Sequence, residues 1–501
     1  MSRTHSNFFP DRRGIEPRPL LLTPNYAAAA GIALALDGGM MRMALCVCGL
    51  LVLISGQASA LERLCDPSVE NCRTQLLSLI DNETQEIDVG FWFLEDNHYV
   101  QHIVARFNAG VRVRLLVDPR GSASSPFNQG VLDAFASAGI PMRKRVTSSI
   151  LHWKMALFGG QHVVEFSGAN FSDNAWHPVS PYTNYVDESI YFTNDPEIVT
   201  SFMRKFDDSW VDTTSFADYA NITNPPARSY PAYSIYPSLN FPPSQSYATR
   251  SISLYGRETS AIDVIMYRIT QQSHSDAIAA AVARGIPVRL ITEPNEYRNP
   301  KRVWDAWNVD RMWKAGVKIR MRAHAGLNHQ KSVILHGLHT VIFGSSNWSS
   351  PSDRSQQEHN YFVDDKAWMV AWFTDQFNRK WNNSNPAGAI ETKAFTPLPP
   401  DAPKYKTPSA NGATGASRTA RLVWYGGPWA HDYDIYFGTS STPPLYTAGK
   451  RLGPSETTSQ TQSYTIPFTL APHTTYYFRI VSKTAAGKSA SGATWSFTTG
   501  G

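Results

Sequence analysis

The sequence predicts an α/β protein made of two homologous α/β/α sandwich lobes that form a pseudo-dimer, followed by a C-terminal all-β sandwich. An internal duplication, and the alternation of strand-like apolar runs with amphipathic helices in both copies, predict the lobes. Short strands of alternating polarity between turn residues predict the final sandwich. The length of 501 residues also indicates several domains.

The N-terminal segment has the layout of an export signal. Arg42 precedes the apolar run 44–54, and the small residues 58–60 resemble a cleavage site. The run is too short to span a bilayer, although an uncleaved anchor is the alternative. We therefore interpret residues 40–60 as a signal peptide and residues 1–39 as a leader or a mis-assigned start, and we expect a secreted or periplasmic protein.

Two cysteines follow the expected cleavage site. Cys65 and Cys72 enclose a short loop, and in an oxidising compartment they could form a disulfide. Two free thiols or a bound metal ion are the alternatives, but no cluster of His and Cys lies nearby in the sequence. We favour the disulfide and expect neither a metal nor a cofactor.

Each lobe begins with a strand, a helix and a second strand. In the first copy these are EIDVGFWFLED, HYVQHIVARFNAG and VRVRLLVDP; in the second they are AIDVIMYRITQ, SHSDAIAAAVARG and IPVRLITEP. Both helices have apolar residues at helical spacing and end at a glycine, Gly110 or Gly285. In each copy a helix, a strand and a hairpin follow, and an amphipathic helix closes the lobe.

The repeats set the expected domain boundaries. Lobe 1 spans residues 61–217 and lobe 2 spans residues 250–385. Residues 218–249 are rich in Pro, Tyr and Ser and are interpreted as an irregular crossover. A Pro-rich linker, residues 386–405, leads to the all-β domain at residues 406–501.

The two hairpins carry the candidate catalytic residues. Each has a His, a Lys two residues later and an Asn eighteen residues after the His: His152, Lys154 and Asn170, then His329, Lys331 and Asn347. Residues two apart on a strand share a face, so each His and Lys point the same way. A structural His could explain one copy, but two copies at the same place in a repeat indicate a site.

Phosphodiester chemistry needs this set of side chains. A neutral His can attack phosphorus and hold it covalently, and a protonated His can give a proton to the departing oxygen. Imidazole suits both tasks because its pKa lies near neutrality. Two Lys and two Asn side chains can stabilise charge on the remaining phosphate oxygens.

The motif H-x-K, present twice and followed by the turns SGAN and GSSN, resembles the H-x-K and G-S-x-N pattern of the phospholipase D superfamily over about residues 61–385. The resemblance implies that His152 is the nucleophile and His329 the acid, with the Lys and Asn residues binding phosphate. It also implies acidic partners that orient the histidines. The candidates for this supporting role, together with a serine of the second turn, are Glu165, Asp187, Glu358 and Ser345.

Both copies depart from the family motif H-x-K-x4-D. Gly159 and His336 occupy the position of the motif Asp. Both positions fall at the hairpin turn, at the opposite end of the strand from the His. We therefore expect a residue there to support the strand end rather than to touch phosphate.

The C-terminal hundred residues resemble a fibronectin type III domain. Leu470, Pro472, Thr474 and Tyr476 fit its L-x-P-x-T-x-Y spacing, and Trp424 suits its core tryptophan. The resemblance implies a binding or spacer module without chemistry, whose partner stays unspecified.

These features predict a secreted phospholipase D-like phosphodiesterase that hydrolyses glycerophospholipids through a covalent phosphohistidine. An exported nuclease of the same superfamily and a non-catalytic binding protein are the alternatives. Removing residues 1–60 leaves 41 Lys and Arg against 38 Asp and Glu, so the charge does not demand nucleic acid. Export and the 12% of aromatic residues favour lipid. We expect a monomer with an internal pseudo-dimer, a phospholipid or other phosphodiester substrate, and peripheral contact with a membrane surface.

Overall fold

The computed structural model describes residues 61–222, 228, 235–407, 410–452 and 460–501. The expected leader and signal peptide lie outside these residues, as does part of the expected crossover. Among the described residues, no helix combines the length and the apolar character needed to cross a membrane.

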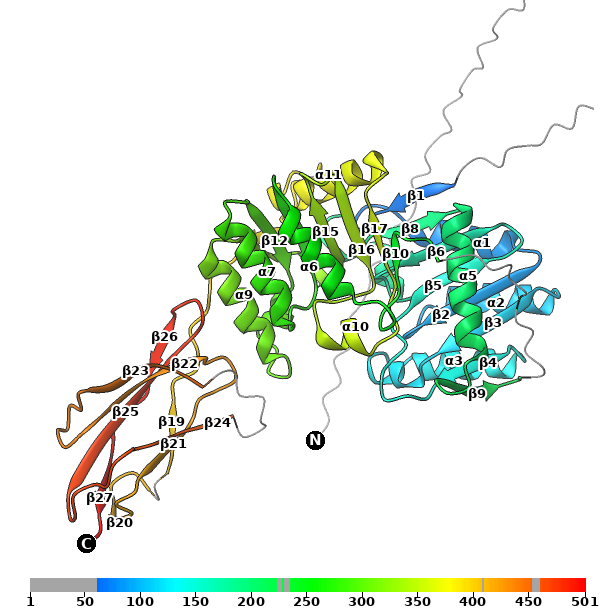
Figure 1. The fold of residues 1–501 in the computed structure, drawn as a ribbon. Helices are drawn as coiled ribbons and strands as arrows, with labels where there is room; N and C mark the ends of the chain where they lie inside the picture. The colour runs from blue at the N-terminus through cyan, green and yellow to red at the C-terminus, as the bar shows by residue number, and fades with distance from the viewer. Residues whose placement is uncertain (1–60, 223–227, 229–234, 408–409, 453–459) are drawn as a thin grey trace, which may run out of the picture. The chain divides into compact units, whose positions relative to one another are not determined.

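An eight-stranded mixed sheet forms the centre of lobe 1, in the order β1-β8-β6-β5-β2-β3-β4-β9 (Figure 1). Its strands are β1 (Glu62–Cys65), β2 (Glu86–Phe91), β3 (Arg112–Val117), β4 (Met142–Arg145), β5 (Lys154–Phe158), β6 (Val163–Ser167), β8 (Ile190–Thr193) and β9 (Phe216–Ala220). Neighbours β2, β3 and β4 run parallel, and the other pairs are antiparallel. The accompanying helices are α1 (Cys72–Asn82), α2 (Asn97–Asn108), the 3-10 helix η1 (Pro119–Ala123), α3 (Asn128–Ser137), α4 (Asp173–Trp176) and α5 (Pro196–Val211).

The sheet of lobe 2 repeats this arrangement strand for strand, in the order β10-β17-β16-β15-β11-β12-β13-β18. Its strands are β10 (Leu239–Asn240), β11 (Ile262–Met266), β12 (Val288–Thr292), β13 (Lys318–Arg322), β15 (Lys331–Leu335), β16 (Thr340–Gly344), β17 (Asn360–Val363) and β18 (Thr392–Ala394). Its helices are α6 (Tyr247–Arg257), α7 (Gln272–Ala283), α8 (Pro294–Tyr297), α9 (Val303–Ala315), α10 (Ser350–Arg354) and α11 (Ala367–Asn382). The duplication read from the sequence is therefore a duplication of sheet topology.

One hydrophobic core joins the two lobes. Helices α5 and α11 contribute Phe202 and Phe373 to it, and both sheets contribute residues from their facing sides. The rings of Phe166 on β6 and Phe343 on β16 stack at 6.0 Å across the junction. Each sheet has a separate core on its other face, under α1, α2 and α3 in lobe 1 and under α6, α7 and α9 in lobe 2. The shared core holds the ends of β5 and β15 close together.

Two short backbone pairings also cross between the lobes. Strand β7 (Asn184–Asp187) of lobe 1 runs parallel to β14 (Ala325–Asn328) of lobe 2. In the opposite direction, Leu151 of lobe 1 forms a parallel bridge with Gln357 of lobe 2. Because both pairings end next to a hairpin histidine, they fix which side chains of one lobe meet the histidine of the other.

The C-terminal residues form two sheets around one core that contains Trp424, Leu470 and Tyr476. The first sheet comprises β19 (Lys404–Thr407), β21 (Arg421–Tyr425) and β24 (Thr461–Thr465). The second comprises β20 (Ala413–Ala416), β22 (Asp432–Gly438), β23 (Leu445–Arg451), β25 (Thr475–Lys483), β26 (Ser489–Ser491) and β27 (Trp495–Thr499). The fibronectin type III assignment stays a prediction.

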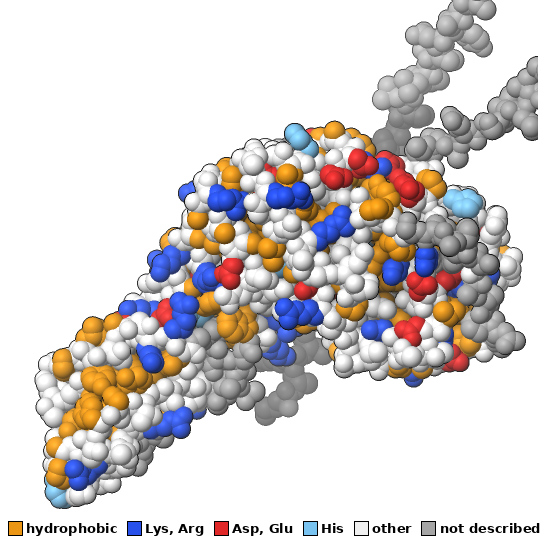
Figure 2. All heavy atoms as spheres, viewed as in Figure 1, with side chains coloured by type: hydrophobic (Ala, Val, Ile, Leu, Met, Phe, Trp, Pro, Cys, Tyr) orange, Lys and Arg blue, Asp and Glu red, His pale blue; other side chains and the backbone are white. Residues whose placement is uncertain are grey.

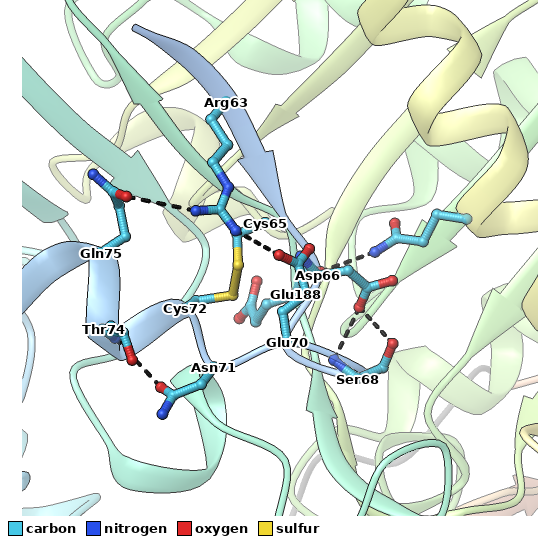
Figure 3. Close-up of a disulfide and its surroundings, with 11 residues drawn as sticks. Arg63, Cys65, Asp66, Ser68, Glu70, Asn71, Cys72, Thr74, Gln75 and Glu188 are labelled. Carbon is cyan, nitrogen blue, oxygen red and sulfur yellow. Dashed lines mark hydrogen bonds and ion pairs between the residues drawn. A yellow bond between two sulfur atoms is a disulfide. The ribbon is translucent and has the colours of Figure 1, made fainter. Parts of the chain in front are cut away.

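The expected disulfide joins Cys65 at the end of β1 to Cys72 at the start of α1 (Figure 3). Arg63 binds Glu70 and Gln75, and Asn71 caps α1 by accepting a hydrogen bond from the backbone N–H of Thr74. Glu188 is among the residues around the disulfide. The bridge therefore ties the end of β1 to the start of α1 in the neighbourhood of Glu188.

Candidate active site

Both hairpin histidines line one cavity of about 480 Å³. His152 lies two residues before Lys154, the first residue of β5. His329 likewise lies two residues before Lys331, the first residue of β15. Asn170 and Asn347, on the turns that follow β6 and β16, line the same cavity. The fold thus brings one His and one Asn of each lobe to a shared space.

The two lysines lie behind the histidines rather than in the cavity wall. Lys154 is fully buried and its Nζ donates to the backbone oxygen of His152 at 2.8 Å. Lys331 donates to the backbone oxygen of His329 in the same way, and its Nζ lies 2.9 Å from the ring Nδ1 of that histidine. Their positive charge acts on the cavity at short range through a dry environment.

Each histidine is oriented by a carboxylate from the opposite lobe. Nδ1 of His152 lies 2.7 Å from Oε2 of Glu358, and Nδ1 of His329 lies 2.5 Å from Oε1 of Glu188. A neutral ring that donates from Nδ1 to a carboxylate keeps its Nε2 lone pair free for the cavity. Ser345 donates to the same Oε2 of Glu358 at 2.5 Å and so supports that carboxylate.

Strand pairing explains this exchange of carboxylates. The backbone N–H of His329 donates to Asp187 O at 3.2 Å at the end of the β7–β14 pair, and Glu188 follows directly. Likewise the N–H of His152 donates to Gln357 O at 2.9 Å, directly before Glu358. In both lobes, therefore, the backbone N–H of the histidine binds the residue that directly precedes the orienting glutamate of the other lobe.

The expectation that Asp187 orients a histidine of the hairpins is wrong. Its carboxylate binds His324 Nε2 at 2.8 Å and the amine of Lys380, away from His329. Consecutive residues of an extended chain point in opposite directions, so the residue that faces His329 is Glu188. The repeat contains the missed signal, since ESIYF and EHNYF place Glu188 and Glu358 at the same position.

Glu165 does not contact either histidine. It is fully buried on β6, accepts a hydrogen bond from Ser167 Oγ at 2.9 Å, and has one carboxyl oxygen without a partner among the described residues. Burial raises the pKa of Glu165 well above its ordinary value. A neutral carboxyl of this kind serves packing behind the site rather than orientation of a ring.

Burial and the lysines set the protonation of the site. Burial, followed by the charge of the lysines, lowers the pKa of both His152 and His329 well below 6.5. Burial also lowers the pKa of Lys154 to about 7 and that of Lys331 to about 8. Burial raises the pKa of each orienting carboxyl, Glu188 and Glu358, to about 8, while the charges of Lys154 and Lys331 favour the ionised form that accepts a hydrogen bond from Nδ1. Without substrate, both histidines are therefore neutral near pH 7.

The small residues of the two turns allow a close approach. A Cβ at Gly168 would lie 2.7 Å from Oε2 of Glu188 and 3.1 Å from the carbonyl oxygen of Gly344. A Cβ at Gly344 would overlap the carbonyl oxygen of His359. The side-chain oxygens of Asn170 and Asn347 have no hydrogen-bond partner within the part of the chain that is described. Because both side chains line the cavity, they lie within reach of a ligand bound there.

The residues that replace the motif Asp lie at the far end of the hairpins, as expected from their position. The backbone N–H of Gly159 donates to Glu86 O, and that of His336 donates to Ala261 O. The Nε2 of His336 lies 2.7 Å from Oδ2 of Asp263. Neither residue lines the cavity.

Several cavity residues were not predicted as site residues. They follow β2 and β11 or lie near the start of α9, and they are Trp92, Phe93, Glu95, Tyr267, Arg268 and Arg302. The ends of equivalent strands on the two sheets meet at the cavity, which is the usual place for ligands in α/β proteins. Among the described residues, no group of three or more His, Cys, Asp or Glu side chains is arranged to hold a metal ion.

Comparison with known proteins agrees with the duplication. The chain matches the family model described as "Cardiolipin synthase, PLD-like domain" over residues 76–210 and 256–381, together more than half of its length. Each matched segment contains one of the two His-x-Lys hairpins. The mitochondrial cardiolipin hydrolase of Chlamydomonas reinhardtii is 25% identical over 134 residues, which are 27% of this chain and 57% of that protein. The chain therefore spans little more than half the length of this curated relative.

Solved structures with a similar fold include the phosphatidylserine synthase of Haemophilus influenzae. Its identity is 14% and its TM-score 0.51, and the match covers 67% of this chain and 87% of the synthase. The phospholipase D family member Nuc of Salmonella typhimurium is 23% identical with a TM-score of 0.28, over 32% of this chain and 99% of Nuc. The likeness to the synthase concerns the fold of the two lobes.

Proposed function

The chain belongs to the phospholipase D-like family described as cardiolipin synthase, PLD-like domain, and from that premise we propose that it hydrolyses glycerophospholipids through a covalent phosphohistidine. The observation that carries the proposal is the meeting of His152 and His329 in one cavity, each held by a carboxylate of the other lobe. Two oriented imidazoles can supply a nucleophile and an acid at one phosphorus atom.

In the first step, Nε2 of neutral His152 attacks phosphorus, and the bond from phosphorus to the leaving oxygen breaks. Protonated His329 gives its Nε2 proton to that oxygen, so the head group leaves as an alcohol. The substrate phosphate brings a negative charge next to Lys154 and Lys331, which opposes their effect and raises the pKa of His329. The two lysines and the side-chain N–H groups of Asn170 and Asn347 stabilise the phosphate oxygens.

In the second step, water attacks the phosphorus of the phosphohistidine. His329, now neutral, accepts a proton from the water, and the bond between phosphorus and Nε2 of His152 breaks. The products are phosphatidate and the restored pair of histidines. An alcohol in place of water would give a transfer product through the same intermediate.

A lipid substrate is supported by the neighbouring families and by the surface. The related proteins are a cardiolipin hydrolase and a phosphatidylserine synthase by name. On the face drawn in Figure 2, Lys and Arg side chains are scattered among hydrophobic and uncharged atoms rather than gathered in a basic stripe. A nucleic-acid groove more often has such a stripe.

We extend the proposal to the setting of the enzyme. Residues 40–60 would direct export, so the protein would act outside the cytoplasm or in the periplasm, where the disulfide between Cys65 and Cys72 persists. The chain would act as a monomer whose two lobes form a pseudo-dimer, in peripheral contact with a membrane surface. Residues 406–501 would be a fibronectin type III-like module that serves as a binding domain or as a spacer.

One experiment tests the reaction. The mature protein is incubated in EDTA with head-group-labelled phosphatidylcholine, and separately with single-stranded and duplex DNA, beside His152→Ala. We expect release of the head group by the wild type only. DNA cleavage without lipid turnover would favour a nuclease, and tight binding without turnover of either would favour a binding protein.

The covalent step is tested by acid-quenching the reaction with lipid labelled in the phosphate. We expect label on His152 after proteolysis and mass spectrometry. Label on His329 would reverse the two roles. A wild type that turns over lipid without any phosphohistidine would overturn the proposed mechanism.

A further inference from the structure

The duplication gives the cavity lining two equivalent segments, one from each lobe. Residues 92–95 follow β2, and residues 267–270 follow β11 in the same backbone geometry. The first N–H of each segment donates to the carbonyl of the residue after the catalytic His, to Trp153 O at 3.1 Å and to Gln330 O at 3.2 Å. The two segments can therefore be compared position by position, as an internal control.

The two segments carry side chains of different charge at equivalent positions. Lobe 1 has Phe93 where lobe 2 has Arg268, and lobe 1 has Glu95 where lobe 2 has Thr270. Trp92, Phe93 and Glu95 line the cavity from lobe 1, and Tyr267, Arg268 and Arg302 line it from lobe 2. Both lobes thus contribute an aromatic residue at the first position, but lobe 1 adds an aromatic and an acidic residue where lobe 2 adds cationic ones.

Glu95 stands out because the cavity has to bind an anion. Its Oε2 accepts a hydrogen bond from Ser125 Oγ at 2.5 Å, and it forms no ion pair with any described residue. On the other side, Nε of Arg268 lies 2.8 Å from Oε2 of Glu296, while Arg302 has no carboxylate partner among the described residues. An unpaired carboxylate near a phosphate site weakens binding unless the ligand supplies a positive charge.

We propose that the face formed by Trp92, Phe93 and Glu95 binds the cationic amine of a zwitterionic phospholipid head group. Aromatic faces and a carboxylate together attract an ammonium group of the choline or ethanolamine class. The face formed by Arg268 and Arg302 then receives the substituent on the other side of phosphorus. This inference rests on the proposed function and adds a head-group class to it.

The same arrangement disfavours a nucleic-acid strand. A strand continues with a phosphate on both sides of the reacting one, so one neighbouring phosphate would face Glu95. A head group with a further phosphate would meet the same repulsion, and the uncharged glycerol of phosphatidylglycerol would gain no attraction from Glu95. A preference for zwitterionic over anionic phospholipids is therefore the property by which the proposed head-group class can be tested.

The test uses monomeric short-chain phosphatidylcholine and phosphatidylglycerol, so that surface charge plays no part, and bis(4-nitrophenyl) phosphate as a diester without a head group. The value of kcat/KM is measured for the wild type, Glu95→Gln, and the double variant Phe93→Arg/Glu95→Thr, which gives lobe 1 the residues of lobe 2. Asp208→Asn, an exposed carboxylate on α5, is the matched control.

We expect the wild type to prefer phosphatidylcholine, and Glu95→Gln to lower the choline-to-glycerol ratio of kcat/KM about tenfold, mostly through KM. The double variant is expected to prefer phosphatidylglycerol, and Glu95→Asp and Asp208→Asn to keep the wild-type preference. Turnover with an unchanged ratio in both Glu95→Gln and the double variant would overturn this assignment alone. No turnover of either lipid or of the chromogenic diester by the folded wild type would overturn the proposed function and this assignment with it.

Discussion

Replacing His336 by the Asp of the family motif tests what the far end of the hairpin requires. His336 lies against Asp263, which is buried and also binds Arg289 through both carboxylate oxygens, at 2.7 and 2.6 Å. Burial would raise the pKa of Asp263, but the hydrogen bonds from His336 and Arg289 outweigh it and hold the pKa below its ordinary value. An Asp at position 336 would therefore place a second carboxylate beside an ionised one.

The expected loss in unfolding free energy is about 3 kcal/mol at pH 7. Two charges 4 Å apart repel by about 4 kcal/mol at an effective dielectric constant of about 20. Losing the hydrogen bond of His336 to a charged group adds about 1.5–3 kcal/mol. Arg289 offsets part of the repulsion, since it lies against the same carboxylate. His336→Asn keeps a donor and should cost about 1 kcal/mol or less, and His336→Ala should fall between the two.

Urea unfolding followed by Trp fluorescence measures these differences, with all three variants compared at pH 7 and pH 4. At pH 4 the introduced Asp takes up a proton, so the extra loss of His336→Asp relative to His336→Ala should shrink. A His336→Asp variant as stable as the wild type at pH 7 would refute the electrostatic account. A loss equal to that of His336→Ala at both pH values would refute it as well.

Three further predictions concern the site and the segment beside it. Glu188→Gln should lower kcat about 10²–10⁴-fold, as expected for a group that orients a catalytic His, whereas Asp187→Asn should mainly lower the urea midpoint; equal effects on kcat would contradict the assignment. Burial lowers the pKa of Lys154 to about 7 and that of Lys331 to about 8, and it raises the pKa of both orienting glutamates to about 8. The site therefore becomes more negative between pH 7 and pH 9, and sulfate, whose charge is constant, should bind about tenfold more tightly at pH 7 than at pH 9 by calorimetry; a flat profile would show that none of these four groups titrates there. Reducing the disulfide, which closes a loop over a sequence separation of 7, should lower the unfolding free energy by about 2–3 kcal/mol, and an unchanged urea midpoint after reduction would be inconsistent with this.

The sequence located the parts of the site that recur at fixed spacing. Because the His, Lys and Asn positions repeat with the hairpin, they could be identified without a structure, and the cavity contains both His and both Asn side chains. Strand alternation limits the rest. Glu188 was missed by one residue, since which of two neighbouring carboxylates faces His329 depends on the register of β7 against β14. That register is a contact between lobes, and among local patterns only the match of ESIYF to EHNYF in the two halves indicates it.

The cavity residues that follow β2 and β11 could not be predicted from the sequence, for a different reason. Phe93 and Arg268 occupy equivalent places, yet neither follows a period or a motif, so nothing in the sequence alone marks them as lining residues. They become lining residues only through the fold, which brings the ends of β2 and β11 to one cavity. The replacements of the motif Asp are explained in the same way, since a carboxylate at position 159 or 336 would face Glu86 or Asp263.

In the proposed mechanism, the buried charges of the site would couple substrate binding to proton uptake. Two lysines and two glutamates lie behind the histidines, and burial shifts all four toward their neutral forms. A phosphodiester would add one negative charge to this set, which favours the protonated lysines and a protonated histidine. Binding of the substrate would then itself produce the acid that the leaving group needs. Because each histidine takes its carboxylate from the other lobe, this coupling requires both lobes in contact, and neither half of the duplication can provide it alone.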